Sequence, residues 1–245
     1  MGSERFLIVC TGRDGSTLLS AILAESGADF NARMTREWNP RAGAYESWTV
    51  AKATAHYDQF IDLNAKSFLS PLIRFRRRIH RLWAKYLMRR HLGKGCFTKI
   101  GSAHRLSQLV RIVGYHPVII LLYRDYRAQF GSAFVRKPFT YSELADKYFN
   151  TLATGLLSLS IYGGCVISYE ELVDPESTDW AKRLGTTCHI DPAVLLQSRS
   201  RLLKVEGGDG VGGYVMQDAR LDALMEKLDL LRRMNHQPSR LGERS

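Results

Sequence analysis

Residues 5–19 read RFLIVCTGRDGSTLL, and the order of residue types in this segment predicts how the fold begins. Its apolar run predicts a buried strand at 6–11, the glycines at 12 and 15 predict a tight turn, and the apolar residues from position 18 predict the start of a helix. A strand, a glycine turn and a helix N-terminus together aim backbone N–H groups at an anion. The segment therefore predicts a phosphate-binding loop in an α/β protein.

This loop differs from the Walker A motif of ATP-binding proteins. That motif requires Gly-x-x-x-x-Gly-Lys-Ser/Thr, whereas Gly12 and Gly15 stand three residues apart and Ser16 follows the second glycine. The lysine that cradles β- and γ-phosphates is therefore missing. An ordinary nucleotide kinase is disfavoured, and a phosphotransferase that uses ATP remains only as an alternative.

Further strands are expected where short apolar runs are followed by polar or glycine residues, at 96–100, 118–123 and 165–169. Helical patterns separate them, which predicts an α/β fold with a mainly parallel sheet flanked by helices on both faces. Ligands of such folds bind at the carboxyl ends of the strands. Candidate residues at or just after these ends are Arg13, Lys99, Arg124 and Tyr169. We expect them to converge on one edge of the sheet.

One segment supplies most of the net charge of +11. Positions 72–92 hold eight of the 35 Lys and Arg residues and no acidic residue, and their apolar residues recur at helical spacing. Two interpretations stay open: a solvated basic face above a core-packed apolar stripe, or a contact with an anionic acceptor or, peripherally, an anionic membrane. Nucleic acid is not expected as a partner, because no recognisable nucleic-acid-binding fold accompanies the charge.

The 245 residues suffice for one α/β domain with a full core. We expect that domain at 1–235, with a helical insertion at about 33–92 and a flexible tail at 236–245. No run approaches the roughly eighteen apolar residues of a membrane span, and the first strand begins almost at the N-terminus, so a cytoplasmic protein is expected. The histidines show no metal-ligand spacing, so we expect no metal site.

With these features in view, the sequence resembles the PAPS-dependent sulfotransferases, whose 5′-phosphosulfate loop is a strand, a turn with Lys or Arg before Ser-Gly-Thr/Ser-Thr, and a helix. Residues 13–19, RDGSTLL, are similar, with Asp14 where Ser is usual. The family's 3′-phosphate site is an Arg ending a later strand and a Ser one helical stretch on, which Arg124 and Ser132 match. Residues 167–175, ISYEELVDP, look like its Tyr-Glu-Asp/Glu-Leu segment. The resemblance implies a P-loop-like sulfotransferase architecture with a helical insertion.

The resemblance also implies how the donor, 3′-phosphoadenosine 5′-phosphosulfate (PAPS), is held without a metal. Arg13 would contact the bridging oxygen and the leaving phosphate, Arg124 and Ser132 would clamp the 3′-phosphate, and Tyr169 would lie near the adenine. Backbone N–H groups and hydroxyls of the loop would hold the 5′-phosphate, from Asp14, Gly15, Ser16, Thr17 and Leu18.

Three residues are candidates for the base that activates the acceptor, and the sequence does not choose among them. Glu37 stands at about the distance after the loop where several carbohydrate- and tyrosine-directed relatives carry a Glu. Glu46 closes residues 39–46, NPRAGAYE, which resemble the Asn-Pro-x-Gly-Tyr/Phe-x-Glu segment of other bacterial members. His104 lies near the family's Lys-Thr-His spacing from Lys99. Lys99 itself is expected either to touch the transferring sulfonate or to be a simple strand-end charge.

The expected activity is therefore transfer of a sulfuryl group from PAPS to a hydroxyl or amine of a small-molecule, saccharide or lipid acceptor, with release of PAP. A non-enzyme alternative is a degenerate homologue that binds nucleotide or anionic membrane without turnover. Asp14 favours this alternative, because a carboxylate beside a sulfonate is electrostatically unfavourable.

Overall fold

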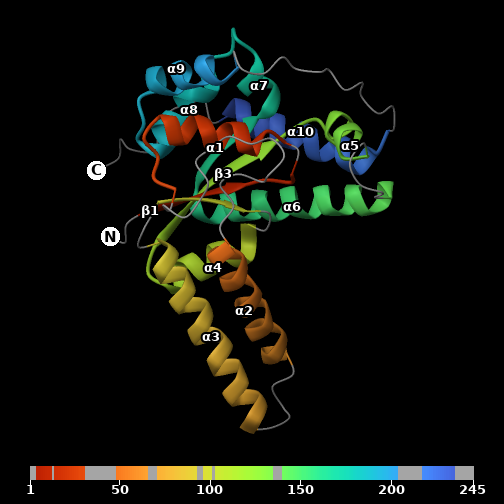
Figure 1. Ribbon diagram of the computed structural model, residues 1–245. Coiled ribbons are helices and arrows are strands. Elements are labelled where there is room, and N and C mark those ends of the chain that lie inside the picture. The colour runs from red at the N-terminus through yellow and green to blue at the C-terminus, as the bar shows by residue number, and fades with distance from the viewer. Residues whose placement is uncertain are drawn as a thin grey trace, which may run out of the picture.

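The computed structural model describes residues 4–12, 14–30, 48–65, 71–92, 96–100, 103–134, 140–203 and 217–234. Within these residues the strands are β1 (Glu4–Val9), β2 (Phe97–Ile100), β3 (His116–Tyr123) and β4 (Gly164–Ser168). They form one four-stranded parallel sheet in the order β2-β1-β3-β4 (Figure 1). Each predicted strand is present, with its ends shifted by two residues or fewer. The prediction of an α/β fold with a parallel sheet is confirmed.

The sheet is apolar on both faces because its strands are continuous apolar runs, as parallel strands covered on both sides usually are. In β1, Leu7 and Val9 face one side while Phe6 and Ile8 face the other. The two inner strands align so that Phe6 lies opposite Val118. Each face therefore needs its own layer of helices.

Helices cover both faces, as the sequence predicted (Figure 1). On the face of Phe6 and Ile8 lie α1 (Ser16–Glu25), α7 (Tyr169–Val173), α8 (Asp179–Cys188) and α9 (Pro192–Leu203). On the face of Leu7 and Val9 lie α2 (Trp48–Ala65), α3 (Pro71–Leu92), α4 (Ala103–Ile112), α5 (Tyr126–Phe134), α6 (Tyr141–Tyr162) and α10 (Ala219–Met234). In the described part of the chain, no helix is long and apolar enough to cross a lipid bilayer.

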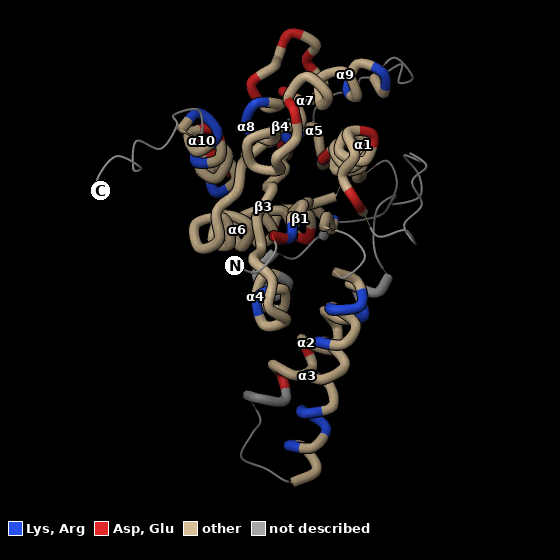
Figure 2. The backbone as a smooth tube through the Cα atoms, turned by 90° about the vertical axis from the view of Figure 1, so that its left-hand side faces the viewer, with Lys and Arg blue, Asp and Glu red and all other residues tan. Residues whose placement is uncertain are grey.

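Helices α2 and α3 form an antiparallel hairpin that projects away from the sheet (Figures 1 and 2). Only the C-terminal half of α3 is buried, at Ala84, Met88, His91 and Leu92. The apolar stripe predicted along α3 is exposed, from 37% at Ile79 to 79% at Leu72. The interpretation in which this stripe packs on the core is therefore wrong, because the helix turns its opposite face inward.

His91 fastens the base of this hairpin to the sheet. It is fully buried at the end of α3, and its Nε2 lies 2.9 Å from Thr98 Oγ1 on β2. Burial lowers the pKa of His91 from its ordinary value of 6.5 to about 4, because the charged imidazolium would lose its hydration.

The lowered pKa of His91 predicts an acid-sensitive fold. Between pH 6.5 and 4 the unfolded chain binds more protons than the folded chain, so stability is complete above pH 6.5 and falls as the pH drops toward 4. The full shift corresponds to about 3 kcal/mol in the free energy of unfolding. The free energy of unfolding of the wild type, measured with urea, should therefore fall between pH 7.5 and pH 4.5. In His91→Gln this fall should be smaller by about 3 kcal/mol. Equal pH slopes in the two proteins would contradict the assignment.

Candidate functional site

The loop after β1 has the predicted strand–turn–helix form. Gly12 and Gly15 have φ values of 83° and 81°, in the left-handed region that favours glycine, and Gly15 is the N-cap of α1. The first intrahelical bond runs from the Leu19 N–H to the Gly15 carbonyl. The N–H groups of Thr17 and Leu18 therefore have no acceptor within the helix and lie at its positive end, at the carboxyl edge of β1. Arg13 lies outside the described residues.

Asp14 turns into this loop. Its side chain is fully buried, and its Oδ2 accepts the Thr11 N–H at 2.5 Å while its Oδ1 accepts the Ser16 N–H at 3.1 Å. The Ser16 N–H, which we expected among the phosphate donors, is thus engaged by a side chain of the loop. In this structure the Asp14 carboxylate holds the turn together from inside.

Helix α5 braces the same loop through Gln129. Its Nε2 donates to the Gly12 carbonyl at 2.7 Å and to Thr11 Oγ1 at 2.8 Å. Half-buried Ser132 follows Gln129 by three residues, which places both on neighbouring positions of one helix face. The sequence reasoning missed Gln129, although its position three residues before Ser132 is the signal that could have drawn attention to it.

Arg124 and Tyr169 meet beside the loop. The Arg124 guanidinium lies over the Tyr169 ring, 4.4 Å from its centroid, in a cation–π contact. Gly15 also lies against that ring, since an added Cβ there would lie 2.2 Å from Tyr169 Cδ2. The loop between β1 and α1, the end of β3 and the start of α7 therefore meet at one place, as expected for strand-end residues of a parallel sheet.

Lys99 brings a buried cation to the first turn of α1. Its side chain is 6% exposed, and its Nζ donates to Thr17 Oγ1 at 3.2 Å. Lys99 therefore joins the loop rather than projecting into solvent from the strand end. The candidate bases are not placed: Glu37 and Glu46 lie outside the described residues, and His104 lies on α4 with a side chain that is also outside them.

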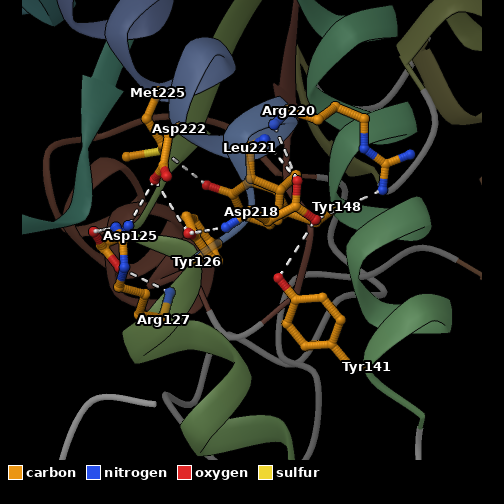
Figure 3. Close-up of polar contacts among 10 residues, drawn as sticks. All are labelled: Asp125, Tyr126, Arg127, Tyr141, Tyr148, Asp218, Arg220, Leu221, Asp222 and Met225. Atoms are coloured by element: carbon orange, nitrogen blue, oxygen red, sulfur yellow. Dashed lines mark hydrogen bonds and ion pairs between the residues drawn. The ribbon is translucent and has the colours of Figure 1, made fainter. Parts of the chain in front are cut away.

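A polar network fixes the chain just after Arg124 (Figure 3). Arg127 pairs with Asp222 of α10 at 2.6 Å, and the Tyr126 hydroxyl donates to the same carboxylate at 3.1 Å. The Tyr148 hydroxyl of α6 donates to the Arg124 carbonyl at 2.6 Å. Burial raises the pKa of Tyr148 well above its usual value, so this phenol stays protonated and keeps donating. Helices α6 and α10 thus position the backbone that carries Arg124.

Within the described residues, the site contains two cations, Lys99 and Arg124, next to helix N–H groups, a constellation suited to an anion. No group of three or more His, Cys, Asp and Glu side chains is placed there, or elsewhere in the described ranges, to hold a metal ion.

A comparison of the sequence with models of known protein families found no match, and a comparison with curated proteins found none either.

Proposed function

We propose that this chain is a PAPS-dependent sulfotransferase. The observation that carries the proposal is the contact between three segments that resemble that family and are distant in the sequence: Gly15 of the loop packs on Tyr169, and Tyr169 lies under Arg124. A nucleotide with a 5′ and a 3′ phosphate needs two separate anion sites around one adenosine. The loop and the Arg124 segment supply two such sites side by side.

In this proposal each segment has one task. The N–H groups of Thr17 and Leu18 would receive the 5′-phosphate at the positive end of α1. Arg124, with Ser132 on α5, would hold the 3′-phosphate, since a planar guanidinium binds phosphate oxygens in pairs. Tyr169 would lie beside the adenine. The site distinguishes PAPS from ATP through Arg124.

The reaction breaks the bond between sulfur and the bridging oxygen as the acceptor oxygen or nitrogen bonds to sulfur, and the acceptor proton passes to a base. Negative charge grows on the leaving phosphate oxygen, so cations held close to it accelerate the transfer. Lys99, bound to Thr17 at the loop, is suited to this role, together with Arg13. The base is proposed among Glu37, Glu46 and His104. The acceptor is proposed to be a small molecule, a saccharide or a lipid.

The geometry of Asp14 weakens one argument for a degenerate nucleotide-binding homologue. The argument for a degenerate homologue was a carboxylate facing the transferred sulfonate. The carboxylate instead accepts N–H groups of Thr11 and Ser16 inside the loop and is fully buried. The electrostatic objection to turnover is therefore weakened.

Isothermal calorimetry with PAP, ATP and ADP, first without metal and then with Mg²⁺, tests the proposal. We expect PAP to bind tightly without metal and ATP to bind weakly in both conditions, because Arg124 and Ser132 would recognise a 3′-phosphate that ATP lacks. Tight ATP binding that requires Mg²⁺ would favour an ATP-dependent phosphotransferase. Absence of binding by all three nucleotides would overturn the nucleotide site altogether.

A further inference from the structure

The outer surface of α3 is apolar. Its large apolar residues are exposed, and at about 100° per residue they fall within a single arc of about 100° around the helix. We call this surface the α3 stripe: Leu72 (79% exposed), Phe75 (65%), Ile79 (37%), Leu82 (58%), Trp83 (50%) and Tyr86 (54%). A continuous stripe of this kind marks an interaction site, unlike single scattered apolar residues.

Most of the stripe does not take part in the packing of α3 on α2. The opposite side of α3 already packs on α2, where Arg77 and Arg81 lie over the Phe60 ring at 5.8 and 5.7 Å. Farther along, His56 Nδ1 and His80 Nδ1 are 2.9 Å apart across the two helices. At the edge of the stripe nearest to His80, the Trp83 ring stacks on the His56 ring of α2, with 6.3 Å between the centroids. The hairpin is therefore closed by one face of α3 together with this edge residue, and the rest of the stripe is turned outward.

Lys and Arg residues occur along the projecting hairpin (Figure 2). On the helical wheel Arg78 and Arg89 stand next to one edge of the stripe and Arg76 next to the other, and all three are exposed. The helix carries eight Lys and Arg residues and no acidic residue. An occupant of this surface must therefore offer negative charge on both sides of an apolar region.

Among the candidate occupants, an anionic lipid bilayer meets this requirement best. A nucleic acid or another polyanion would pair with the arginines but would leave the six apolar side chains in water. A second copy docked face to face would bring two strongly cationic helices together, which is repulsive. A bilayer surface offers anionic head groups above an acyl region, and arginine side chains reach from the apolar layer to the head groups.

We propose that the α3 stripe and its flanking arginines dock this protein on an anionic membrane surface, with α3 lying in the plane of the head groups. The hairpin projects from the sheet (Figure 1), so α3 presents its outer face without the sheet in the way. This inference does not depend on the proposed sulfotransferase activity.

Co-sedimentation of the full chain with lipid vesicles tests the proposal. Vesicles of phosphatidylcholine alone are compared with vesicles in which part of that lipid is replaced by phosphatidylglycerol. We expect the anionic vesicles to bind at least about tenfold more tightly, and the difference to shrink at high salt, because each cation near the surface adds a screened attraction. Equal binding to both vesicle types, or no binding to either, would overturn the proposal.

A pair of variants isolates the apolar contribution. Phe75→Ser combined with Leu82→Ser removes two exposed side chains of the stripe, so the fold should be unaffected, and binding to anionic vesicles should fall about tenfold. The matched control is Leu157→Ser with Ile161→Ser, which removes two apolar side chains that are similarly exposed on α6 (49% and 51%) and should bind as the wild type does. Wild-type binding by the α3 variant would overturn the proposal.

A second pair isolates the charge. Arg78→Glu with Arg89→Glu should abolish the preference for anionic vesicles, whereas Lys147→Glu with Arg201→Glu, exposed elsewhere and equal in net charge, should retain most of it. An equal loss in both pairs would show a net-charge effect and overturn the assignment to α3. A solution dimer that the Phe75 and Leu82 variant dissociates would also overturn it, since a second copy would then cover the stripe.

Discussion

Replacement of Arg124 by alanine is expected to weaken PAP binding by well over tenfold. A hydrogen bond to a charged group contributes roughly 1.5–3 kcal/mol, which corresponds to about 10- to 150-fold in affinity, and a guanidinium makes such bonds in pairs. AMP lacks only the 3′-phosphate, so its affinity should stay within about twofold. Calorimetry with both ligands on both proteins gives the ratio of PAP to AMP affinity, which tests the proposed 3′-phosphate site.

Two controls separate recognition from folding. Arg124→Lys keeps the charge but loses the planar fork, so its PAP affinity should lie between those of the wild type and the alanine variant. The Tyr148 hydroxyl bonds to the backbone carbonyl of Arg124, so this anchor survives either substitution and thermal unfolding should change little. An unchanged ratio of PAP to AMP affinity in Arg124→Ala would remove Arg124 from the phosphate site.

Replacement of Gly15 by alanine should be among the most destabilising single changes in the loop. The left-handed backbone at φ 81° costs a non-glycine residue roughly 1–2 kcal/mol, and the new methyl group would overlap the Tyr169 ring, which adds about 1–3 kcal/mol. We therefore expect a loss of about 3 kcal/mol or more in the free energy of unfolding, measured with urea. PAP affinity should fall with it, because the loop cannot keep its shape.

Gly12→Ala is the matched control for this experiment. Gly12 has nearly the same φ, 83°, but no heavy atom lies within 4 Å of its added Cβ, so only the backbone cost should appear. Combining Gly15→Ala with Tyr169→Ala should recover part of the Gly15 loss, and the coupling energy from this cycle measures the contact. If Gly12→Ala and Gly15→Ala cost the same, Tyr169 does not pack on Gly15.

The sheet was predictable because strands buried on both faces read as uninterrupted apolar runs, as in β1 and β3. The meeting of Gly15, Arg124 and Tyr169 was predictable for a related reason, since the carboxyl ends of parallel strands share one edge. The contact of Gln129 with the loop was not predicted: its spacing from Ser132 places it on the same helix face, but spacing alone does not show that this face meets residues 11 and 12. The inward turn of Asp14 depends on side-chain rotation, which residue spacing does not encode.

The orientation of α3 was the main feature that the sequence left open. Helical spacing of apolar residues shows that a helix has an apolar face, but the same spacing results whether that face meets the core or the outside. Here small and medium-sized residues, Ala84 and Met88 among them, make the inner contact, while the larger aromatic ones lie outside. Glu37 and Glu46 lie beyond the described residues, so the choice of base stays a prediction.

The place of β1 inside the sheet also governs when the site can form during folding. Its residue Phe6 is paired with Phe97 on one side and Val118 on the other, so neither partner is a sequence neighbour. Such non-local pairings slow folding, because the entropy cost of closing a long chain segment precedes the contacts that compensate for it. During synthesis β1 therefore stays unpaired until the residues of β2 or β3 have left the ribosome. The loop between β1 and α1 should accordingly form late, only once β3 has paired with β1.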